Sequence, residues 1–552
     1  MSYKYITSII AFYLLSCLYV PQTIQAQTPG ITTSPKHEVR AVWLTTIGGI
    51  DWPHSYARSQ SGIAKQQQEL TDILDKLRKA NVNTVLLQAR IRATTIYPSR
   101  FEPFDGCLSG NPGISPGYDA LAFAIDECHK RGMECHAWVV TIPIGKWNGA
   151  GCKALRKKMP GAIKRIGEEG YMNPENPATA TYLADMCAEI TDNYDIDGIH
   201  LDYIRYPETW NITIPRQQAR NHITNIVKAV NKAVKARKPW VKMSCSPVGK
   251  YSDLTRYSSY GWNAYQKVCQ DAQAWLRDGL MDQIYPMMYF RGNQFYPFAD
   301  DWEENSYGRT VVPGLGIYFL DPKEGKWKVE DVTREMEVSR NLGMGHAYFR
   351  SHFFTENKQG IYDTASDFID RLPALVPPMT WQSKTKPEIP NDMRVNYNND
   401  HTSIKWQGSA PYYNLYSSDT FPVDTDAPCN LVAQRIQTNK IIIKTSSPRF
   451  YALRAMDRYG IESDAVQNYS LPKAESLLID NNGRKIELND KVKSLDTKYV
   501  SIETVQGCIV ATSRIVNSSI DISNLRPGIY IIRSIDRNGV SHRIGCFAKR
   551  MS

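Results

Sequence analysis

The sequence lacks the features that mark several protein classes. A mean hydropathy of −0.42 excludes a membrane protein with several spanning helices. None of the 11 cysteines belongs to a C-x-x-C pair, so neither a structural zinc site nor a dense disulfide scaffold is indicated. The net charge of +10 comes in short clusters such as residues 156–158, which predicts a solvated basic surface and no nucleic acid partner.

The N-terminus has the layout of an export signal. Lys4 precedes an apolar run, residues 6–20, that is short for a membrane span, and Ala26 is a small residue at a plausible cleavage point. Residues 1–26 are therefore predicted to be a cleaved signal peptide, which places the protein in the periplasm, on the outer-membrane surface or outside the cell. A lipoprotein signal ending at Cys17 is the alternative, although the residues after Cys17 stay apolar.

A chain of 552 residues has room for one large domain and smaller modules. From residue 36 to 375, short apolar runs alternate with longer helical patterns. The expected strands are residues 39–45, 82–90, 133–140, 197–203, 241–248, 283–289, 310–318 and 345–350, and the expected helices are 66–80, 119–131, 178–194, 217–236, 263–277 and 329–341. This alternation predicts an α/β fold, a (β/α)8 TIM-type barrel. An open doubly wound sheet is the alternative, but no glycine-rich phosphate loop follows the first strand.

The composition changes after Pro373. A proline-rich linker is followed by residues 385–470, which alternate like a β-sandwich, and by a strand-rich segment, 474–552, with repeated turn signals. Neither module gathers polar groups suited to catalysis. The barrel is therefore expected to fold and act alone from residue 27 to about 375.

The fourth expected strand carries the best candidate for chemistry. In such barrels the active site lies at the C-terminal strand ends, and residues two apart on a strand share a face. His200 and Asp202 therefore face the same way, with Asp202 at the strand end beside Tyr203 and Arg205. A carboxylate there is placed for acid, base or nucleophile work. Asp195 and Asp197 precede the strand and are expected at the opposite end of the barrel.

Polar and aromatic residues also end the neighbouring strands. Aromatic rings beside hydrogen-bond donors suit a sugar, because its CH faces stack and its hydroxyls accept directed bonds. The expected substrate-binding residues are Trp52, Gln88, Arg90, His136, Trp138, His200, Tyr203, Arg205, Tyr289, Tyr348 and Arg350. No cofactor and no metal is expected.

Several of these segments resemble a known family. The motifs are Glu38-Val39-Arg40-Ala41-Val42-Trp43-Leu44, Ile50-Asp51-Trp52-Pro53, Leu87-Gln88-Ala89-Arg90, His136-Ala137-Trp138 and Asp197-Gly198-Ile199-His200-Leu201-Asp202-Tyr203. Together they are similar to the glycosyl-hydrolase-like family 10 domain over about residues 36–375. The resemblance implies a (β/α)8 barrel acting on glycans, and family members include glycosidases that cut the sugar strands of peptidoglycan.

Two positions depart from the family pattern. Many members carry a paired Asp-Asp-Tyr where this chain has Asp202-Tyr203-Ile204, and many read Pro-Gln-Val-Tyr where it has Pro286-Met287-Met288-Tyr289. Glycoside hydrolysis normally needs two carboxyl groups. Asp202 is the first candidate, and Glu102, Asp51 and Glu356, in loops after other strands, are candidates for the second.

The tail modules carry resemblances of their own. Residues 385–470 look like a fibronectin type III domain, and residues 474–552 are similar to a type IX secretion sorting domain. The second resemblance implies a Bacteroidetes-type bacterium and outer-membrane secretion machinery as a partner.

Three functions follow from these observations. The first is an exported glycoside hydrolase acting on a cell-wall or related polysaccharide. The second is a glycan-binding barrel that has lost catalysis. The third is a metal-dependent hydrolase using His136, His200 and Asp202, but the chain lacks the paired His-x-His on the first strand that is usual for such barrels.

Overall fold

The structure is a computed structural model. It describes residues 34–255, 257, 261–398, 400–444, 449–468, 478–479, 484–487, 499–504, 507–515, 519–535 and 541–549. The predicted signal peptide, residues 1–26, lies outside the described residues. Within the described part, no helix has the length and apolar character needed to cross a membrane.

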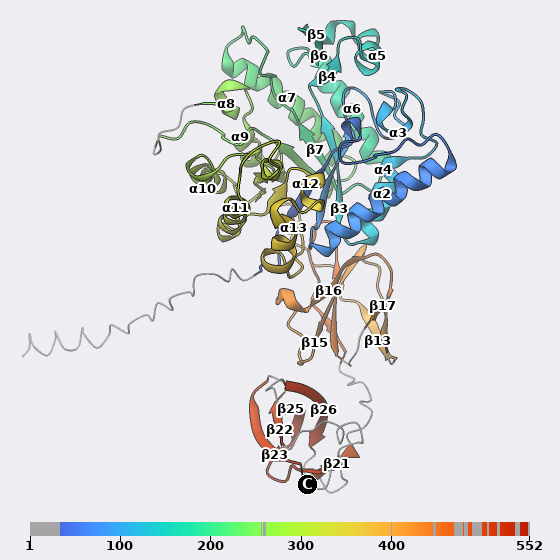
Figure 1. The fold of residues 1–552 in the computed structure, drawn as a ribbon, viewed down its shortest axis with the longest axis vertical. Coiled ribbons are helices and arrows are strands. Elements are labelled where there is room, and N and C mark those ends of the chain that lie inside the picture. Colours follow the sequence, from blue (N-terminus) through green and yellow to red (C-terminus); the bar gives the residue numbers. More distant parts are fainter. Residues whose placement is uncertain are drawn as a thin grey trace, which may run out of the picture. The chain divides into compact units, whose positions relative to one another are not determined.

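The large domain is built on a parallel sheet with helices outside it (Figure 1). The strands are β1 (Arg40–Leu44), β2 (Thr84–Arg90), β3 (Glu134–Val140), β7 (Gly198–Asp202), β8 (Lys242–Ser246), β9 (Gln283–Ile284), β10 (Thr310–Val311), β11 (Gly314–Leu315) and β12 (His346–Tyr348). Their order is β10-β9-β8-β7-β3-β2-β1-β12-β11, and every pairing is parallel. A strand is therefore present in each of the eight predicted ranges. The sixth is much shorter than predicted, with two residues, and the seventh is split into β10 and β11.

The sheet closes through its seventh strand. Strands β10 and β11 are two halves of that strand, separated by Val312 and Pro313. The first half pairs with β9 and the second half with β12, and Gly314 also bridges to Met287 beyond β9. Because both neighbours are joined through residues 310–315, the sheet is a (β/α)8 barrel, and the open-sheet alternative is wrong.

The helices cover the outside of the barrel. They are α2 (Gln60–Lys79), α3 (Gly106–Ser109), α4 (Ala120–Lys130), α5 (Ala150–Lys158), α6 (Pro177–Asn193), α7 (Arg216–Lys235), α8 (Ala264–Lys267), α9 (Ala272–Arg277), α10 (Tyr296–Glu304), α11 (Val329–Asn341), α12 (Ser351–Thr355) and α13 (Ile361–Thr364). Side chains cap the N-termini of several of these helices. Asp119 caps α4 by accepting a hydrogen bond from the Ala122 amide. Asn176 caps α6 by accepting one from the Ala178 amide, and Pro177 is the first residue of that helix.

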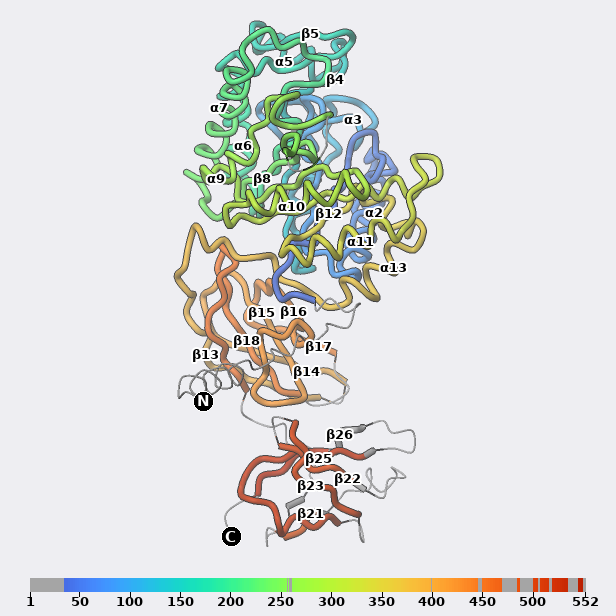
Figure 2. The backbone as a smooth tube through the Cα atoms, turned by 90° about the vertical axis from the view of Figure 1, so that its left-hand side faces the viewer, coloured from blue at the N-terminus to red at the C-terminus, as the bar shows by residue number. Residues whose placement is uncertain are grey.

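A small antiparallel sheet is inserted after β3. It contains β4 (Pro143–Lys146), β5 (Ile163–Ile166) and β6 (Glu169–Met172), with β6 in the middle. Figure 2 shows β4, β5 and α5 together at one end of the barrel domain. The sequence pattern predicts neither this sheet nor α5. The insertion follows the C-terminal end of a barrel strand, which is the face where barrel active sites lie.

Inside the barrel, polar side chains of three adjacent strands form rows beside a buried cluster that includes Trp43, Leu86 and Tyr285. Alternate residues of β3, β7 and β8 meet there, because side chains two apart share a face. Lys242 bonds Glu134 at 2.8 Å in the lowest row. In the next row the Nδ1 atom of His200 lies 3.0 Å from the Ser244 hydroxyl. The row at the C-terminal strand ends contains Trp138, Asp202 and Ser246.

After the linker the chain forms two antiparallel sheets. One contains β13 (Asn391–Tyr397), β14 (His401–Gln407) and β17 (Lys440–Lys444). The other contains β16 (Leu431–Ile436), β15 (Tyr412–Ser418), β18 (Phe450–Met456) and β19 (Val466–Gln467). Side chains from both sheets, including Ile404, Tyr413 and Leu453, share one core. The predicted sandwich is therefore present as an all-β module.

The last module is also built of antiparallel strands. Its two sheets are formed by β20 (Leu478–Ile479), β21 (Lys485–Glu487) and β24 (Ser519–Asp521), and by β22 (Tyr499–Thr504), β23 (Ile509–Arg514), β25 (Gly528–Ile535) and β26 (Ser541–Lys549).

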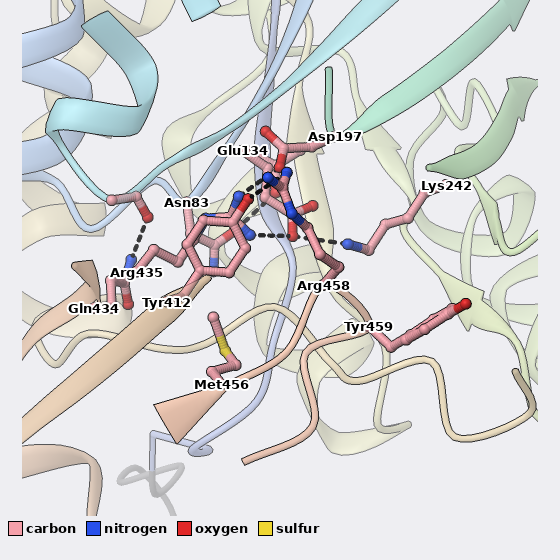
Figure 3. Close-up of polar contacts among 12 residues, drawn as sticks. Asn83, Glu134, Asp197, Lys242, Tyr412, Gln434, Arg435, Met456, Arg458 and Tyr459 are labelled. Atoms are coloured by element: carbon pink, nitrogen blue, oxygen red, sulfur yellow. Dashed lines mark hydrogen bonds and ion pairs between the residues drawn. The ribbon is translucent and has the colours of Figure 1, made fainter. Parts of the chain in front are cut away.

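The sandwich contributes charge to the end of the barrel opposite the active-site face. Arg435 of β16 pairs with Glu134 at 3.1 Å and also with Asp197, while its guanidinium lies 4.2 Å from the centre of the Tyr412 ring (Figure 3). Both carboxylates are buried. Arg458 pairs in the same way with Asp195. The two aspartates that precede β7 thus lie at the end of the barrel opposite the C-terminal strand ends, as the sequence predicts.

Candidate active site

A pocket of about 630 Å³ lies at the C-terminal ends of the barrel strands. Its aromatic lining residues are Trp138, Tyr171, Tyr203, Tyr289 and Phe349, and its charged ones are Arg92, Glu169, Asp202, Glu208 and Arg350. Flat rings with charged and polar groups between them are the surface that a sugar requires.

Asp202 ends β7 inside this pocket and is 6% exposed. Three donors fix its carboxylate. The Trp138 indole donates to Oδ2 at 3.1 Å, the Ser246 hydroxyl donates to Oδ1 at 2.8 Å, and the Tyr203 amide donates to Oδ1 at 2.8 Å. These donors come from β3, from β8 and from the residue that follows β7, so the barrel itself holds the carboxyl group in place.

The surroundings of Asp202 favour its protonated form. Burial raises the pKa of the carboxyl group above its ordinary value, and the hydrogen bonds from Ser246, Tyr203 and Trp138, with the charge of Arg205, offset only part of that effect. A carboxyl group with a raised pKa at a sugar-sized pocket is suited to donate a proton.

The loop after Asp202 brings a second carboxylate to the pocket. Tyr203 takes a positive φ of 52° and lines the pocket. The buried Arg205 guanidinium lies 4.5 Å from the centre of the Tyr203 ring and binds Glu208 at 2.6 Å. Glu208 lines the pocket, and its side chain is 47% exposed. The segment 202–208 therefore presents one buried and one accessible carboxyl group.

Five of the predicted binding residues line the pocket: Gln88, Trp138, Tyr203, Tyr289 and Arg350. The Gln88 side-chain oxygen accepts bonds from the Thr46 and Ile47 amides at 3.0 and 2.9 Å, so it also shapes the loop after β1.

Asp51 and Trp52 support the pocket from outside it. The Asp51 carboxylate pairs with Arg350 and accepts bonds from Thr45. Trp52 is buried, and its indole donates to the Gln66 carbonyl at 2.8 Å. Neither side chain belongs to the pocket lining.

The other proposed carboxylates are engaged elsewhere. Glu102 forms a two-pronged pair with buried Arg90, at 2.7 and 2.9 Å, and neither residue lines the pocket. Glu356 lies on the surface, 2.8 Å from Lys358, which with nearby His352 lowers its pKa.

The remaining predicted binding residues are buried below or beside the pocket. His136 lies 3.0 Å from Glu134, and Tyr348 donates to Asp370 at 3.0 Å. His200 accepts a bond from the Trp43 indole at 3.3 Å. Burial lowers the pKa of His200 well below its ordinary value, so it is neutral. Arg205 does not line the pocket; it contacts two residues that do, Glu208 and Tyr203.

Sequence reasoning missed Glu169, Glu208, Tyr171 and Arg92 in the pocket lining. Glu208 carried a usable signal, since it follows the strand end of Asp202 by six residues in a loop on the same face. Glu169 and Tyr171 lie on the inserted strand β6, which had no periodicity long enough to recognise.

The proposed metal-ligand set does not come together. The Nε2 atom of His136 is engaged by Glu134, and the two ring nitrogens of His200 are engaged by Trp43 and Ser244. Among the described residues, the group with metal-like spacing is Glu38, His346 and Asp370. Arg340 binds both carboxylates of that group, at 2.6 and 2.7 Å, so a cation would have to compete with a buried guanidinium.

Comparison with known proteins agrees with this geometry. The family model described as "Glycosyl hydrolase-like 10" matches residues 38–219 and 209–314, which together make up half of the chain. The chain belongs to the glycosyl hydrolase-like 10 family. The matched region contains β1 to β10 and therefore Asp202 with all three of its donors.

Two relatives of this glycosyl hydrolase-like 10 chain are glycosyl hydrolases by name. It is 28% identical to "Glycosyl hydrolase YngK" of Bacillus subtilis (strain 168) over 426 residues, which is 69% of this chain and 83% of that protein. It is 26% identical to "Glycosyl hydrolase DigH" of Escherichia coli (strain K12) over 322 residues, which is 51% of this chain and 73% of that protein. The solved glycoside hydrolase domain of PgaB from Bordetella bronchiseptica aligns with 60% of this chain and 99% of that one, at 12% identity and a TM-score of 0.42.

Proposed function

We propose that the protein is an exported glycoside hydrolase that cleaves glycosidic bonds in a bacterial cell-wall or related polysaccharide at the pocket around Asp202. The observation that carries this proposal is the buried carboxyl group of Asp202, with its raised pKa, held by three donors in an aromatic pocket. The glycosyl hydrolase-like 10 family supports the reaction class.

Asp202 is the general acid in this proposal, and Glu208 is the base that activates the water. The roles follow from their surroundings: Asp202 is buried, whereas Glu208 is accessible and bound by the Arg205 guanidinium. Glu169 is the competing partner, but its ion pair is with Lys146, whose side chain is 67% exposed. A buried, ring-stacked arginine holds a carboxylate in place more firmly than an exposed lysine does.

The proposed reaction uses one water. Glu208 takes a proton from the water, whose oxygen forms a bond to the anomeric carbon of the sugar. The bond from that carbon to the glycosidic oxygen breaks, its electron pair stays on the oxygen, and that oxygen takes the proton of Asp202. Asp202 ends ionised and Glu208 protonated, and exchange with solvent restores both.

The choice of a cell-wall polysaccharide rests on the family resemblance and on the pocket lining. Tyr203 and Tyr289 line the same pocket as Asp202 and offer rings for stacking on sugars. Export is supported by the sequence of residues 1–26, and delivery through outer-membrane machinery by the sorting-like residues 474–552. The resemblance of residues 385–470 to a fibronectin type III domain supports that identity for the sandwich.

A glycan-binding barrel without catalysis is the second candidate. It is favoured by one observation: none of Asp51, Glu102 and Glu356 lines the pocket. The assignment of Glu208 as the second carboxyl group is what separates the enzyme from this candidate.

The test is to incubate the protein with purified peptidoglycan glycan strands and to measure cleavage by the appearance of new reducing ends. Asp202→Asn keeps the shape of the side chain but cannot donate the proton, so turnover should fall by roughly 10²–10⁴-fold. Glu208→Gln should cause a loss of the same order, because the water is no longer activated. In the wild-type protein, activity should fall as pH rises through the raised pKa of Asp202.

Glu168→Gln is the matched control, since Glu168 neighbours Glu169 but is 72% exposed and paired with Arg165. It should turn over like the wild-type protein. If Glu208→Gln stays active while Glu169→Gln does not, Glu169 is the partner. If strands bind but the wild-type protein releases no reducing ends, the binding-only candidate is correct.

A further inference from the structure

A second hollow lies beside the pocket on the same face of the barrel. It has a volume of about 410 Å³ and is lined by the loops that follow β1 and β2. Its lining includes Gly48, Gly49, His54 and Tyr56 from the first loop and Gly106 from the second. Both loops leave the C-terminal ends of their strands, as the loops around Asp202 do.

One turn of chain separates the two cavities. Ile47 and Ile50 line the pocket, whereas Gly48 and Gly49 between them line the second hollow. Consecutive Cα atoms are about 3.8 Å apart, so the two cavities are separated by a single short turn of backbone. A Cβ atom placed on either glycine would meet no atom within 4 Å, so the space over this turn is open.

Tyr56 forms an exposed platform at this hollow. It is 54% exposed, and the Arg58 guanidinium lies 4.9 Å from the centre of its ring. Arg58 donates to the Ser109 carbonyl at 3.3 Å, and the Ala57 amide donates to the Leu108 carbonyl at 2.8 Å. The ring is therefore held in place by its neighbours before any ligand binds, which lowers the entropic cost of stacking.

The chemistry of the lining favours an uncharged ring. Among the residues that line the hollow there is no Asp, Glu, Lys or Arg; glycine and proline backbone, Tyr56, Cys107 and His54 make it up. A sugar ring stacks its CH face on an aromatic ring and bonds its hydroxyls to backbone and imidazole groups.

We propose that this hollow is a second sugar-binding subsite, which holds the continuation of the glycan chain whose scissile bond lies at Asp202. Tyr56 stacks on a sugar of that chain after it crosses the turn formed by Ile47–Gly49. This inference rests on the proposed function and deepens it: the substrate is a polymer bound across both cavities, and short fragments reach only the pocket.

The test compares chain lengths in the full-length protein. Peptidoglycan glycan strands are fractionated by length, and kcat/KM is measured for each fraction with wild-type protein and Tyr56→Ala. Loss of one stacking ring should lower kcat/KM about threefold to tenfold for long chains and leave the shortest cleaved chain unaffected. Tyr307→Ala is the matched control, since Tyr307 is 49% exposed and lines neither cavity.

Nitration of Tyr56, followed by mass spectrometry, gives a second readout that needs no substitution. Long chains bound to Asp202→Asn should protect Tyr56, and the shortest chains should not. Equal effects of Tyr56→Ala at all lengths, no effect at any length, or nitration that long chains leave unchanged would overturn the subsite while the proposed function stands. A wild-type protein that cleaves no fraction would instead contradict the proposed function.

Discussion

Glu335 is a buried acid that the proposed chemistry does not use. It lies on α11 and is fully buried, and neither carboxyl oxygen has a hydrogen-bond partner among the described residues. Burial, with a smaller contribution from Asp331, raises its pKa to about 9. The side chain is therefore neutral in the folded protein near neutral pH, whereas it is ionised in the unfolded chain.

This difference makes stability depend on pH. The folded state binds the Glu335 proton more tightly than the unfolded state does. Below the unfolded pKa of about 4.5 the group is protonated in both states, so its ionisation does not lower the free energy of unfolding. As pH rises from there towards about 9, stability is lost at up to about 1.4 kcal/mol per pH unit.

Glu335→Gln should remove this dependence. Between about pH 5 and pH 8, the free energy of unfolding of the variant should rise relative to wild type by roughly 2–4 kcal/mol. Chemical denaturation at both pH values measures the difference. Glu337→Gln, at an exposed position of the same helix, should follow the wild-type protein, and a Glu335→Gln curve parallel to wild type would show that the carboxyl group is not a neutral buried acid.

The sequence predicts which residues reach the pocket where the alternation of side chains along a strand determines it. Asp202 and Trp138 lie on the same inward face of adjacent strands, and parity alone brings both to the pocket. The partner carboxyl group was not predictable in that way, because loop residues have no periodicity. Glu102 is a loop residue of this kind, and its pairing with buried Arg90 is a tertiary contact that no sequence pattern indicates.

Among the elements, those with a long periodic pattern were predicted best. Helices α2, α4, α6, α7 and α11 lie within a few residues of the predicted ranges, apart from an earlier start of α2. The helix expected over 263–277 is split into α8 and α9, because Cys269 takes a positive φ of 59° between them and the Gln270 side chain accepts a bond from the Val248 amide.

The strands of the inserted sheet are too short to be predicted from hydrophobic periodicity. Strands β4, β5 and β6 have four residues each, which is too short for an alternation to stand out. Yet β6 supplies Glu169 and Tyr171 to the pocket. The part of the pocket wall that β6 supplies is therefore the part that could not be predicted from the sequence.

At the scale of the whole molecule, the sandwich and the barrel share buried charge. Glu134 is held by Lys242, His136 and Arg435, which outweigh burial and lower its pKa to about 2. Asp197, bound by Arg435 and His129, likewise has a pKa well below its ordinary value. Arg435, which comes from outside the barrel, thus binds both carboxylates, and residues 27–375 alone would lack this partner.

Arg435→Gln should therefore destabilise the barrel and not only the sandwich. Removing one partner of a buried ion pair leaves the other charge uncompensated, at a cost of about 3–5 kcal/mol. Thermal unfolding followed by barrel tryptophan fluorescence should show the loss. Arg394→Gln, at an exposed ion pair with Asp392 on the same module, should cost less than about 1 kcal/mol. Equal stability of the two variants would mean that the barrel does not depend on Arg435.

The central claim is that the pocket around Asp202 hydrolyses a glycan, and product mass tests it most directly. Purified peptidoglycan glycan strands are incubated with wild-type protein and with Asp202→Asn, and the fragments are analysed by mass spectrometry. We expect wild-type fragments whose summed mass exceeds that of the parent chain by one water for each bond cut, and almost none from Asp202→Asn. Intact strands in both samples, or equal cleavage by both proteins, would contradict the claim.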